Sequence, residues 1–176
     1  AAKKFINTKY KVLFIEQDSY LGGVLKNSNK VKTINGLTPQ EWIRETEELI
    51  LNSKNITILK NTLVTTYNFT NHLIALEDKF AGKKIDLNKS ELTLHKIRTS
   101  NTIIANGHIE RFISFRNNDL PGVMLASSFE KYIHRYGVVP EKEPVIFTNN
   151  SSTLSLLKKL ISLGCKPKAY VDYRKK

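Results

Sequence analysis

Short apolar runs recur along the chain and predict buried strands. They lie at residues 11–16, 55–59, 102–106, 145–148 and 169–172. Each run is short, is rich in apolar residues and is bounded by polar ones, as is typical of strands in a parallel sheet. Helical patterns separate several of these runs. The alternation of strand and helix predicts an α/β fold.

The clearest helix signal covers residues 38–52. Thr38 can cap the helix, Pro39 suits the first helical position, and Glu41 completes a capping box. The apolar stripe of this helix is expected to consist of Trp42, Leu49 and Ile50.

Two further helices are predicted over residues 124–136 and 152–163. Gly137 and Gly164 follow them and serve as C-terminal stops. Residues 1–8 have the spacing of the end of a helix, so we expect the chain to begin inside an element.

Between these elements the hydrophobic period changes to two. Segments 62–68, 72–78 and 91–97 alternate apolar and polar residues, with turns expected at Asn71 and at residues 81–83. Such a pattern predicts a small antiparallel meander.

Composition narrows the possible classes of function. The chain has 176 residues with eight glycines, five prolines and one cysteine, which excludes an internal disulfide and a cysteine-built zinc site. The four histidines lack metal-ligand spacing. No apolar run approaches the roughly 18 residues of a membrane span, and the N-terminus lacks a signal-peptide pattern. We therefore expect a cytoplasmic protein without a membrane partner.

The formal net charge of +12 raises the alternative of a nucleic-acid-binding module. Most of the positive charge is lysine, scattered through every segment without a long basic block. Together with abundant Asn and Ile, this composition is typical of an A/T-rich coding sequence. We favour a solvated lysine-rich surface and no nucleic-acid partner, whereas the alternative predicts strongly salt-dependent DNA binding.

Glu16 is the first candidate site residue. It closes the run KVLFIE, and a carboxylate at the end of such a strand can accept hydrogen bonds from the ribose of a dinucleotide. Gly22 and Gly23 follow and would allow close approach of a ligand to the backbone. The G-x-G-x-x-G turn of dinucleotide-binding folds, expected roughly 20 residues before the acid, does not occur in these 176 residues.

Two later segments add to this pattern. In TIIANGHIERFISFRNNDLPGVM, a strand leads into Ala105-Asn106-Gly107 and a Leu-Pro-Gly turn. In PVIFTNNSSTLSLLKKLISLGCKPKAYVD, a β-α-β unit has the turn TNNSS where glycines would be expected. Because Cβ atoms in that turn would crowd a pyrophosphate, this unit is predicted to bind nucleotides poorly.

Together these segments resemble the α subunit of heterotetrameric sarcosine oxidase and related α-type subunits of opine and proline dehydrogenases. The stretches that carry the resemblance are VLFIEQDSYLGG, ITILKNTLVTTYNFTNH, NNDLPGVMLAS, RYGV and FTNN. The usual Ala-Thr-Gly is Ala-Asn-Gly here. The family often has Asp-Glu-Arg where this chain has Glu16-Gln17-Asp18, so a cation near the cofactor is lost.

The resemblance implies a Rossmann-like parallel sheet of the FAD/NAD(P)-binding, glutathione-reductase-like type with an antiparallel meander inserted and the first βα unit incomplete. Residues 1–140 would form a first dinucleotide-binding domain that lacks its first strand and phosphate loop and includes the meander at about 62–98. Residues 141–176 would begin a second Rossmann-like domain.

By matched position, the resemblance implies a site for NAD in which the adenosine contacts residues 16–18. Val24 would lie near the phosphates and Val64 beside the adenine. The complete set of implied cofactor-binding residues is Glu16, Gln17, Asp18, Gly23, Val24, Val64, Ala105 and Gly107. No catalytic or metal-ligating residue is expected.

In the family, flavin chemistry and sarcosine oxidation belong to a partner β subunit, with γ and δ subunits completing the assembly. Tetrahydrofolate and FMN are expected only elsewhere in that complex. The chain would then hold NAD without redox chemistry and be inactive alone. The alternative is an FAD- or NAD(P)-dependent oxidoreductase, such as an opine or amino-acid dehydrogenase α subunit, with its own flavin.

Overall fold

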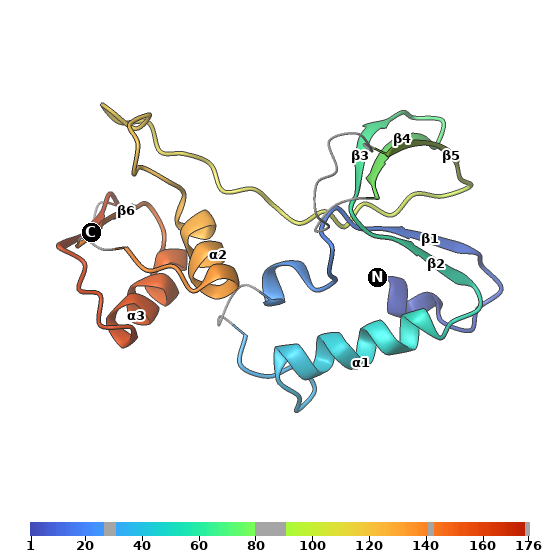
Figure 1. Ribbon diagram of the computed structural model, residues 1–176, viewed down its shortest axis with the longest axis horizontal. Coiled ribbons are helices and arrows are strands. Elements are labelled where there is room, and N and C mark those ends of the chain that lie inside the picture. The colour runs from blue at the N-terminus through green and yellow to red at the C-terminus, as the bar shows by residue number, and fades with distance from the viewer. Residues whose placement is uncertain (27–30, 80–90, 141–142, 175–176) are drawn as a thin grey trace. The chain divides into compact units, whose positions relative to one another are not determined.

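A computed structural model describes residues 1–26, 31–79, 91–140 and 143–174 of the chain (Figure 1). The chain divides into two compact units. Unit 1 comprises Ala1–Gly23 and Thr33–Asn106, and unit 2 comprises Val24–Lys32 and Gly107–Lys176. Parallel strand pairs, an antiparallel sheet and helices are all present, which confirms the mixed α/β class.

Unit 1 is built on a parallel pair of strands, β1 (Val12–Ile15) and β2 (Ile56–Leu59), with Val12 opposite Ile56. The 3-10 turn η1 (Ala2–Phe5) and the helix α1 (Pro39–Leu51) of this unit precede β2. A second 3-10 turn, η2 (Gly23–Lys26), lies between β1 and α1 in the chain and belongs to unit 2 except for Gly23. The strands 11–16 and 55–59 and their parallel pairing are thus confirmed. Residues 1–8, predicted as the end of a helix, form only one 3-10 turn and a bend.

The start of α1 confirms the predicted capping box. The Thr38 hydroxyl accepts a hydrogen bond from the Glu41 backbone N–H at 3.3 Å, and the Glu41 carboxylate accepts one from the Thr38 N–H at 2.9 Å. The latter bond holds the pKa of Glu41 below its ordinary value. Ile43 and Ile50 are buried, seven residues apart on one helix face, whereas Leu49 is 48% exposed and does not belong to the buried stripe.

The meander is a three-stranded antiparallel sheet of β3 (Thr62–Tyr67), β4 (His72–Asp78) and β5 (Leu92–Arg98). Its first turn lies at Asn71, whose φ of 56° is the left-handed conformation that Asn tolerates. The register shifts between Val64 and Thr66, which marks a bulge in β3. The second predicted turn, at 81–83, lies outside the described residues.

Unit 2 contains the helix α2 (Ala126–Tyr136), then β6 (Val145–Thr148), the 3-10 turn η3 (Ser151–Thr153), α3 (Leu154–Ser162) and β7 (Ala169–Asp172). β6 and β7 pair in parallel, so the predicted β-α-β unit is present. Its buried core consists of Ile133, Ile146, Leu156 and Leu160. Gly137 (φ 66°) and Gly164 (φ 80°) follow the two helices, as predicted.

The prediction of a strand at residues 102–106 is wrong. This segment is extended but pairs with none of the described strands, and Ile103 and Ile104 are 60% and 65% exposed. A short apolar run becomes a strand only where another strand offers a free edge in the right place. The run has the composition of a strand without the partner that would make it one.

Candidate functional site

The candidate site of unit 1 is centred on Glu16, which directly follows β1. Its backbone N–H donates to the carbonyl of Leu59, the last residue of β2, at 2.8 Å. Its carboxylate accepts a hydrogen bond from the backbone N–H of Asp18 at 3.0 Å. Because Glu16 directly follows β1, it lies at the carboxyl edge of the parallel pair, where α/β folds bind ligands, and it is half-buried there.

The turn that follows Glu16 is fixed to the start of β3. The Thr62 N–H donates to the Glu16 carbonyl at 2.9 Å, and the Asn61 N–H donates to the Asp18 carbonyl at 3.2 Å. The Thr62 side chain is buried, and its hydroxyl donates to the carbonyl of Lys60. These bonds bring the first residues of β3 beside the Glu16 turn. Val64 lies two residues further along this strand and is 38% exposed.

The two glycines after this turn have different roles. Gly22 has a φ of 111°, and a Cβ there would lie 2.6 Å from Cδ1 of Ile43, so its smallness allows α1 to pack closely. A Cβ on Gly23 would meet nothing within 4 Å. Gly23 therefore leaves open space at the position where the sequence predicted close approach of a ligand.

The remaining predicted site residues are more exposed. Gln17 is exposed, and Val24 is 61% exposed and belongs to unit 2. Ala105 lies in the exposed segment 102–106 of unit 1, and Gly107, also exposed, is the next residue after that segment and belongs to unit 2. Of the eight residues, the structure brings Glu16, Gln17 and Asp18 into one turn, and backbone hydrogen bonds hold the start of β3 beside it.

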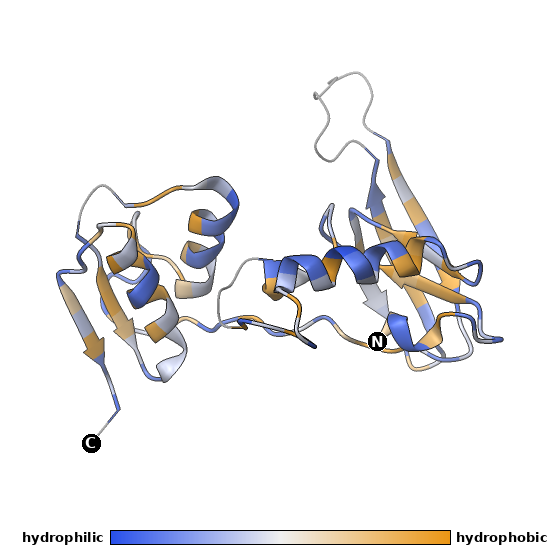
Figure 2. Cartoon of the chain, turned by 90° about the horizontal axis from the view of Figure 1, so that it is seen from below, coloured by the Kyte–Doolittle hydropathy of each residue, from blue (hydrophilic) through white to orange (hydrophobic). Residues whose placement is uncertain are grey.

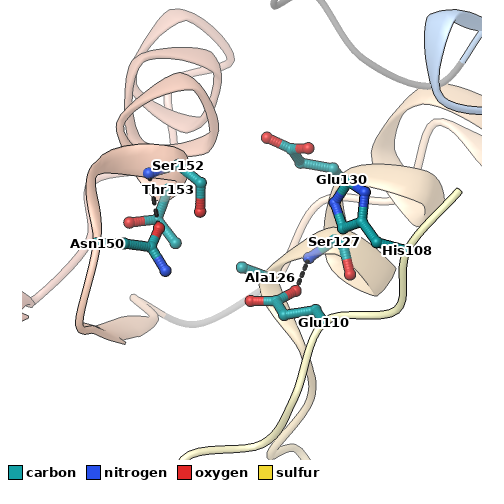
Figure 3. A pocket seen from close by; sticks show the side chains of 8 residues that line it. All are labelled: His108, Glu110, Ala126, Ser127, Glu130, Asn150, Ser152 and Thr153. Atoms are coloured by element: carbon teal, nitrogen blue, oxygen red, sulfur yellow. Dashed lines mark hydrogen bonds between the residues drawn. The ribbon is translucent and has the colours of Figure 1, made fainter.

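Unit 2 contains a separate hollow of about 320 Å³ beside the β6–α3 turn. Figure 3 shows Asn150, Ser152 and Thr153 on one side of it and His108, Glu110 and Glu130 on the other. Its lining is completed by Ala126 and Ser127.

Side chains already cap the backbone N–H groups at this hollow. The Glu110 carboxylate accepts from the Ser127 N–H at 2.7 Å, at the start of α2. The Asn150 side-chain oxygen accepts from the Ser152 N–H at 2.8 Å, at the start of η3. At both helix starts the serine supplies the backbone N–H that is capped. The Glu110 and Glu130 carboxylates that line the hollow disfavour a phosphate there.

The carboxylate of Asp172, the last residue of β7, is already bound by a side chain of the protein. Arg174 donates to both carboxylate oxygens of Asp172 and, at 3.2 Å, to the hydroxyl of Ser151 in the β6–α3 turn. The hydrogen bonds from Arg174 lower the pKa of Asp172 to about 2. The spacing Asp-x-Arg was the signal in the sequence for this pair. Glu110 lies 17 residues before its partner Ser127, and no local signal could have indicated it.

Cys165 is half-buried and packs against the core of unit 2. Within the described residues, no three His, Cys, Asp or Glu side chains are arranged to hold a metal ion. None of the described helices is both long and apolar enough to cross a bilayer.

No model of a known protein family matches the chain. It is 30% identical over 177 residues to sarcosine oxidase subunit alpha of Rhizobium meliloti (strain 1021), which covers 94% of this chain and 18% of that subunit. It is 27% identical over 170 residues to sarcosine oxidase subunit alpha of Corynebacterium sp. (strain U-96), covering 93% of this chain and 17% of that subunit.

Among solved structures, L-proline dehydrogenase from P. horikoshii matches with a TM-score of 0.61 and 18% identity, over 92% of this chain and 30% of that one. This match shows a shared fold. The proteins matched are an oxidase subunit and a dehydrogenase, both oxidoreductases. The resemblance predicted from the sequence is thereby confirmed: nearly the whole chain is similar to a stretch of sarcosine oxidase subunit alpha that makes up 17–18% of the length of that subunit.

Proposed function

We propose that the chain is the nucleotide-holding part of an amine oxidoreductase subunit and that it binds NAD through the carboxyl edge of β1 and β2. The observation that carries this proposal is the place of Glu16, a half-buried carboxylate that follows β1 and is held by its own turn. A carboxylate at that edge accepts hydrogen bonds from ribose hydroxyls. The similarity to sarcosine oxidase subunit alpha supports it.

The residues present fit the adenosine half of a dinucleotide better than its pyrophosphate. One oxygen of Glu16 is oriented by the Asp18 N–H, Gly23 leaves open space, and Val64 on β3 offers a partly exposed apolar side chain. The described residues offer no glycine-rich turn whose N–H groups could bind the phosphates. Binding of NAD to this chain is therefore weak, with a Kd of about 1 mM or above.

In this proposal the bound NAD stabilises the fold and takes no part in redox chemistry. Oxidative demethylation of sarcosine or a related secondary amine takes place on the flavin of a partner β subunit, in an assembly completed by γ and δ subunits. FMN and tetrahydrofolate bind outside this chain, and the assembly is cytoplasmic. The division at residue 140 between two dinucleotide-type domains belongs to the same proposal.

A second candidate is an α-type dehydrogenase subunit that binds FAD as its own redox cofactor. The fold match to an L-proline dehydrogenase favours this candidate. A bound oxidised flavin absorbs visible light, whereas NAD does not, so the identity of the bound cofactor distinguishes the two candidates.

The test is an NMR titration of the isotope-labelled chain with NAD and, separately, with FAD. Glu16→Gln is the critical variant, because Gln keeps an oxygen that can accept the Asp18 N–H but loses the charge. Replacing a charge-assisted bond to ribose by a neutral one should weaken NAD binding about tenfold. Glu45→Gln, on the exposed face of α1, is the matched control and should bind like the parent chain.

Three results would contradict the proposal. The first is NAD shifts confined to residues away from the Glu16 turn, and the second is equal affinity of the Glu16→Gln and Glu45→Gln variants. The third is tight FAD binding with a visible absorption band, which would establish the second candidate instead.

A further inference from the structure

One face of the meander is apolar and uncovered. The register places Leu63, Leu76 and Leu94 in one row across the three strands. Towards one end follow a row with Thr66, Ile74 and Lys96 and a row with His72 and Arg98, and towards the other end Asp78 lies opposite Leu92. These residues lie on the same side of the sheet because side chains alternate along each strand. We call this side the leucine–lysine face, made up of Leu63, Thr66, His72, Ile74, Leu76, Asp78, Leu92, Leu94, Lys96 and Arg98.

The opposite side of the sheet is the one that the protein itself covers. Ala75 and Leu73, which point to that side, are 0% and 9% exposed. On the leucine–lysine face, Leu63 and Leu94 are 52% and 56% exposed. The solvated side of an antiparallel sheet ordinarily carries polar residues. Figure 2 shows apolar segments on the meander strands.

One end of this face is cationic. A hollow of about 310 Å³ is lined there by Thr66, Asn68, His72, Leu73, Ile74, Lys96, Ile97 and Arg98. That lining includes no carboxylate. Neither Lys96 nor Arg98 forms an ion pair with a carboxylate of the described residues. Phe69, in the turn between β3 and β4 at the same end, is 102% exposed.

We propose that the leucine–lysine face docks another polypeptide that presents an apolar stripe ending in carboxylates. The leucines supply the contact that desolvation favours, and the two cations select for acidic residues at one end. A second copy of this chain fits poorly, because it carries a net charge of +12 and the same cations. A single-stranded nucleic acid fits poorly too, because Lys96 and Arg98 alone make only a short basic track for its phosphates.

The size of the face sets the strength of the contact. Three strands about 4.8 Å apart and seven residues of about 3.3 Å each give an area of roughly 330 Å². A stable interface buries about 800 Å² on each partner. The face is therefore one part of a larger interface, and a short partner segment alone binds weakly.

The experiment uses the full chain and a fluorescent helical peptide with a leucine stripe and glutamates at one end. Binding is followed by anisotropy, and contacts are mapped by carbodiimide cross-linking, which joins lysines to carboxylates that touch. We expect a Kd in the range of about 0.1–1 mM and cross-links at Lys96 in preference to exposed Lys54. The double variant Lys96→Glu/Arg98→Glu should weaken binding at least about tenfold.

Two controls separate this result from general attraction between charges. Lys54→Glu removes the same kind of charge elsewhere in unit 1 and should change the affinity less than about twofold. Leu94→Gln, at an exposed position, should weaken binding while circular dichroism shows an unchanged fold. No binding of the acidic peptide, equal binding of a peptide with lysines in place of its glutamates, or loss of affinity with Lys54→Glu equal to that of the double variant would overturn the proposal. So would tighter binding of oligothymidylate that the double variant abolishes, because the face would then bind nucleic acid.

Discussion

Asn55 ties three segments of unit 1 together, and its removal is the sharpest test of how this unit is held. Its side-chain NH₂ group donates to the carbonyl of Phe5 at 2.8 Å and to the carbonyl of Tyr10 at 2.7 Å. Its side-chain oxygen accepts from the hydroxyl of Ser53, a buried residue, at 2.6 Å. The amide thus joins the 3-10 turn η1, the segment just before β1 and the start of β2.

The expected loss follows from these three bonds. A hydrogen bond contributes about 1 kcal/mol net, and a buried partner left unsatisfied costs about 1–3 kcal/mol. The Tyr10 carbonyl is exposed and can bind water instead, so its bond counts for little. Asn55→Ala should therefore lower the free energy of unfolding of unit 1 by about 2 kcal/mol. Asn55→Asp should lower the free energy of unfolding further once the new carboxyl group is ionised, because a carboxylate would then face the carbonyl oxygens of Phe5 and Tyr10.

Urea unfolding followed by tryptophan fluorescence measures this loss in the right unit. Trp42, the only tryptophan, lies in α1, and the Lys3 ammonium of η1 is 5.8 Å from the centre of its ring. Asn52→Ala, an exposed asparagine three residues earlier, is the control and should stay within about 0.5 kcal/mol of the parent chain. If Asn55→Ala is as stable as Asn52→Ala, the argument that this amide anchors η1 to β2 is wrong.

Three further predictions concern single positions. Gly22→Ala should destabilise unit 1 by about 2–4 kcal/mol through overpacking and backbone strain, whereas Gly36→Ala, where a Cβ meets nothing within 4 Å, should cost about 1 kcal/mol in the same urea assay. Thr38→Ala should cost about 1 kcal/mol of helix capping, seen as a lower urea midpoint. Asp172 should titrate near 2 in a carboxyl NMR titration and return towards 3.8 in Arg174→Gln. Because its pKa is lowered in the folded state, the Asp172–Arg174 contribution to stability is complete above pH 3.8 and is lost as the pH falls towards 2.

The features that the sequence predicted correctly depend on residues close together in the chain. The capping box of α1 needs only Thr38 and Glu41, and the ends of α2 and α3 need only the glycines that follow them. The meander follows from alternation within each strand and from Asn71 at its first turn. The position of Glu16 at a strand end is equally local, since the apolar run before it fixes the strand.

What could not be predicted depends on residues far apart in the chain. Asn55 binds backbone groups 50 and 45 residues away, and no periodicity indicates such a bond. The bulge at Thr65 shifts the register of β3 against β4, which alternation alone does not reveal. The leucine–lysine face combines three strands, so its cationic end emerges only when their register is known.

Residues 102–106, which the sequence wrongly predicted to form a strand, and the candidate site both bear on the unpaired edge of β1. The N–H groups of Val12 and Glu16 point to β2, because they donate to the carbonyls of Asn55 and Leu59. Successive N–H groups of a strand point to opposite edges, so those of Leu13 and Ile15 point away from β2, to an edge where none of the described strands pairs with β1. The same unit thus contains an unpaired strand edge and an unpaired apolar run, and a strand bound at that edge would extend the sheet. Because Glu16 directly follows β1, a strand at that edge would also fix its carboxylate more firmly before a ligand arrives. If the proposed function holds, we therefore expect the NAD affinity measured for this chain alone to be a lower bound on the affinity of the same residues in an extended sheet.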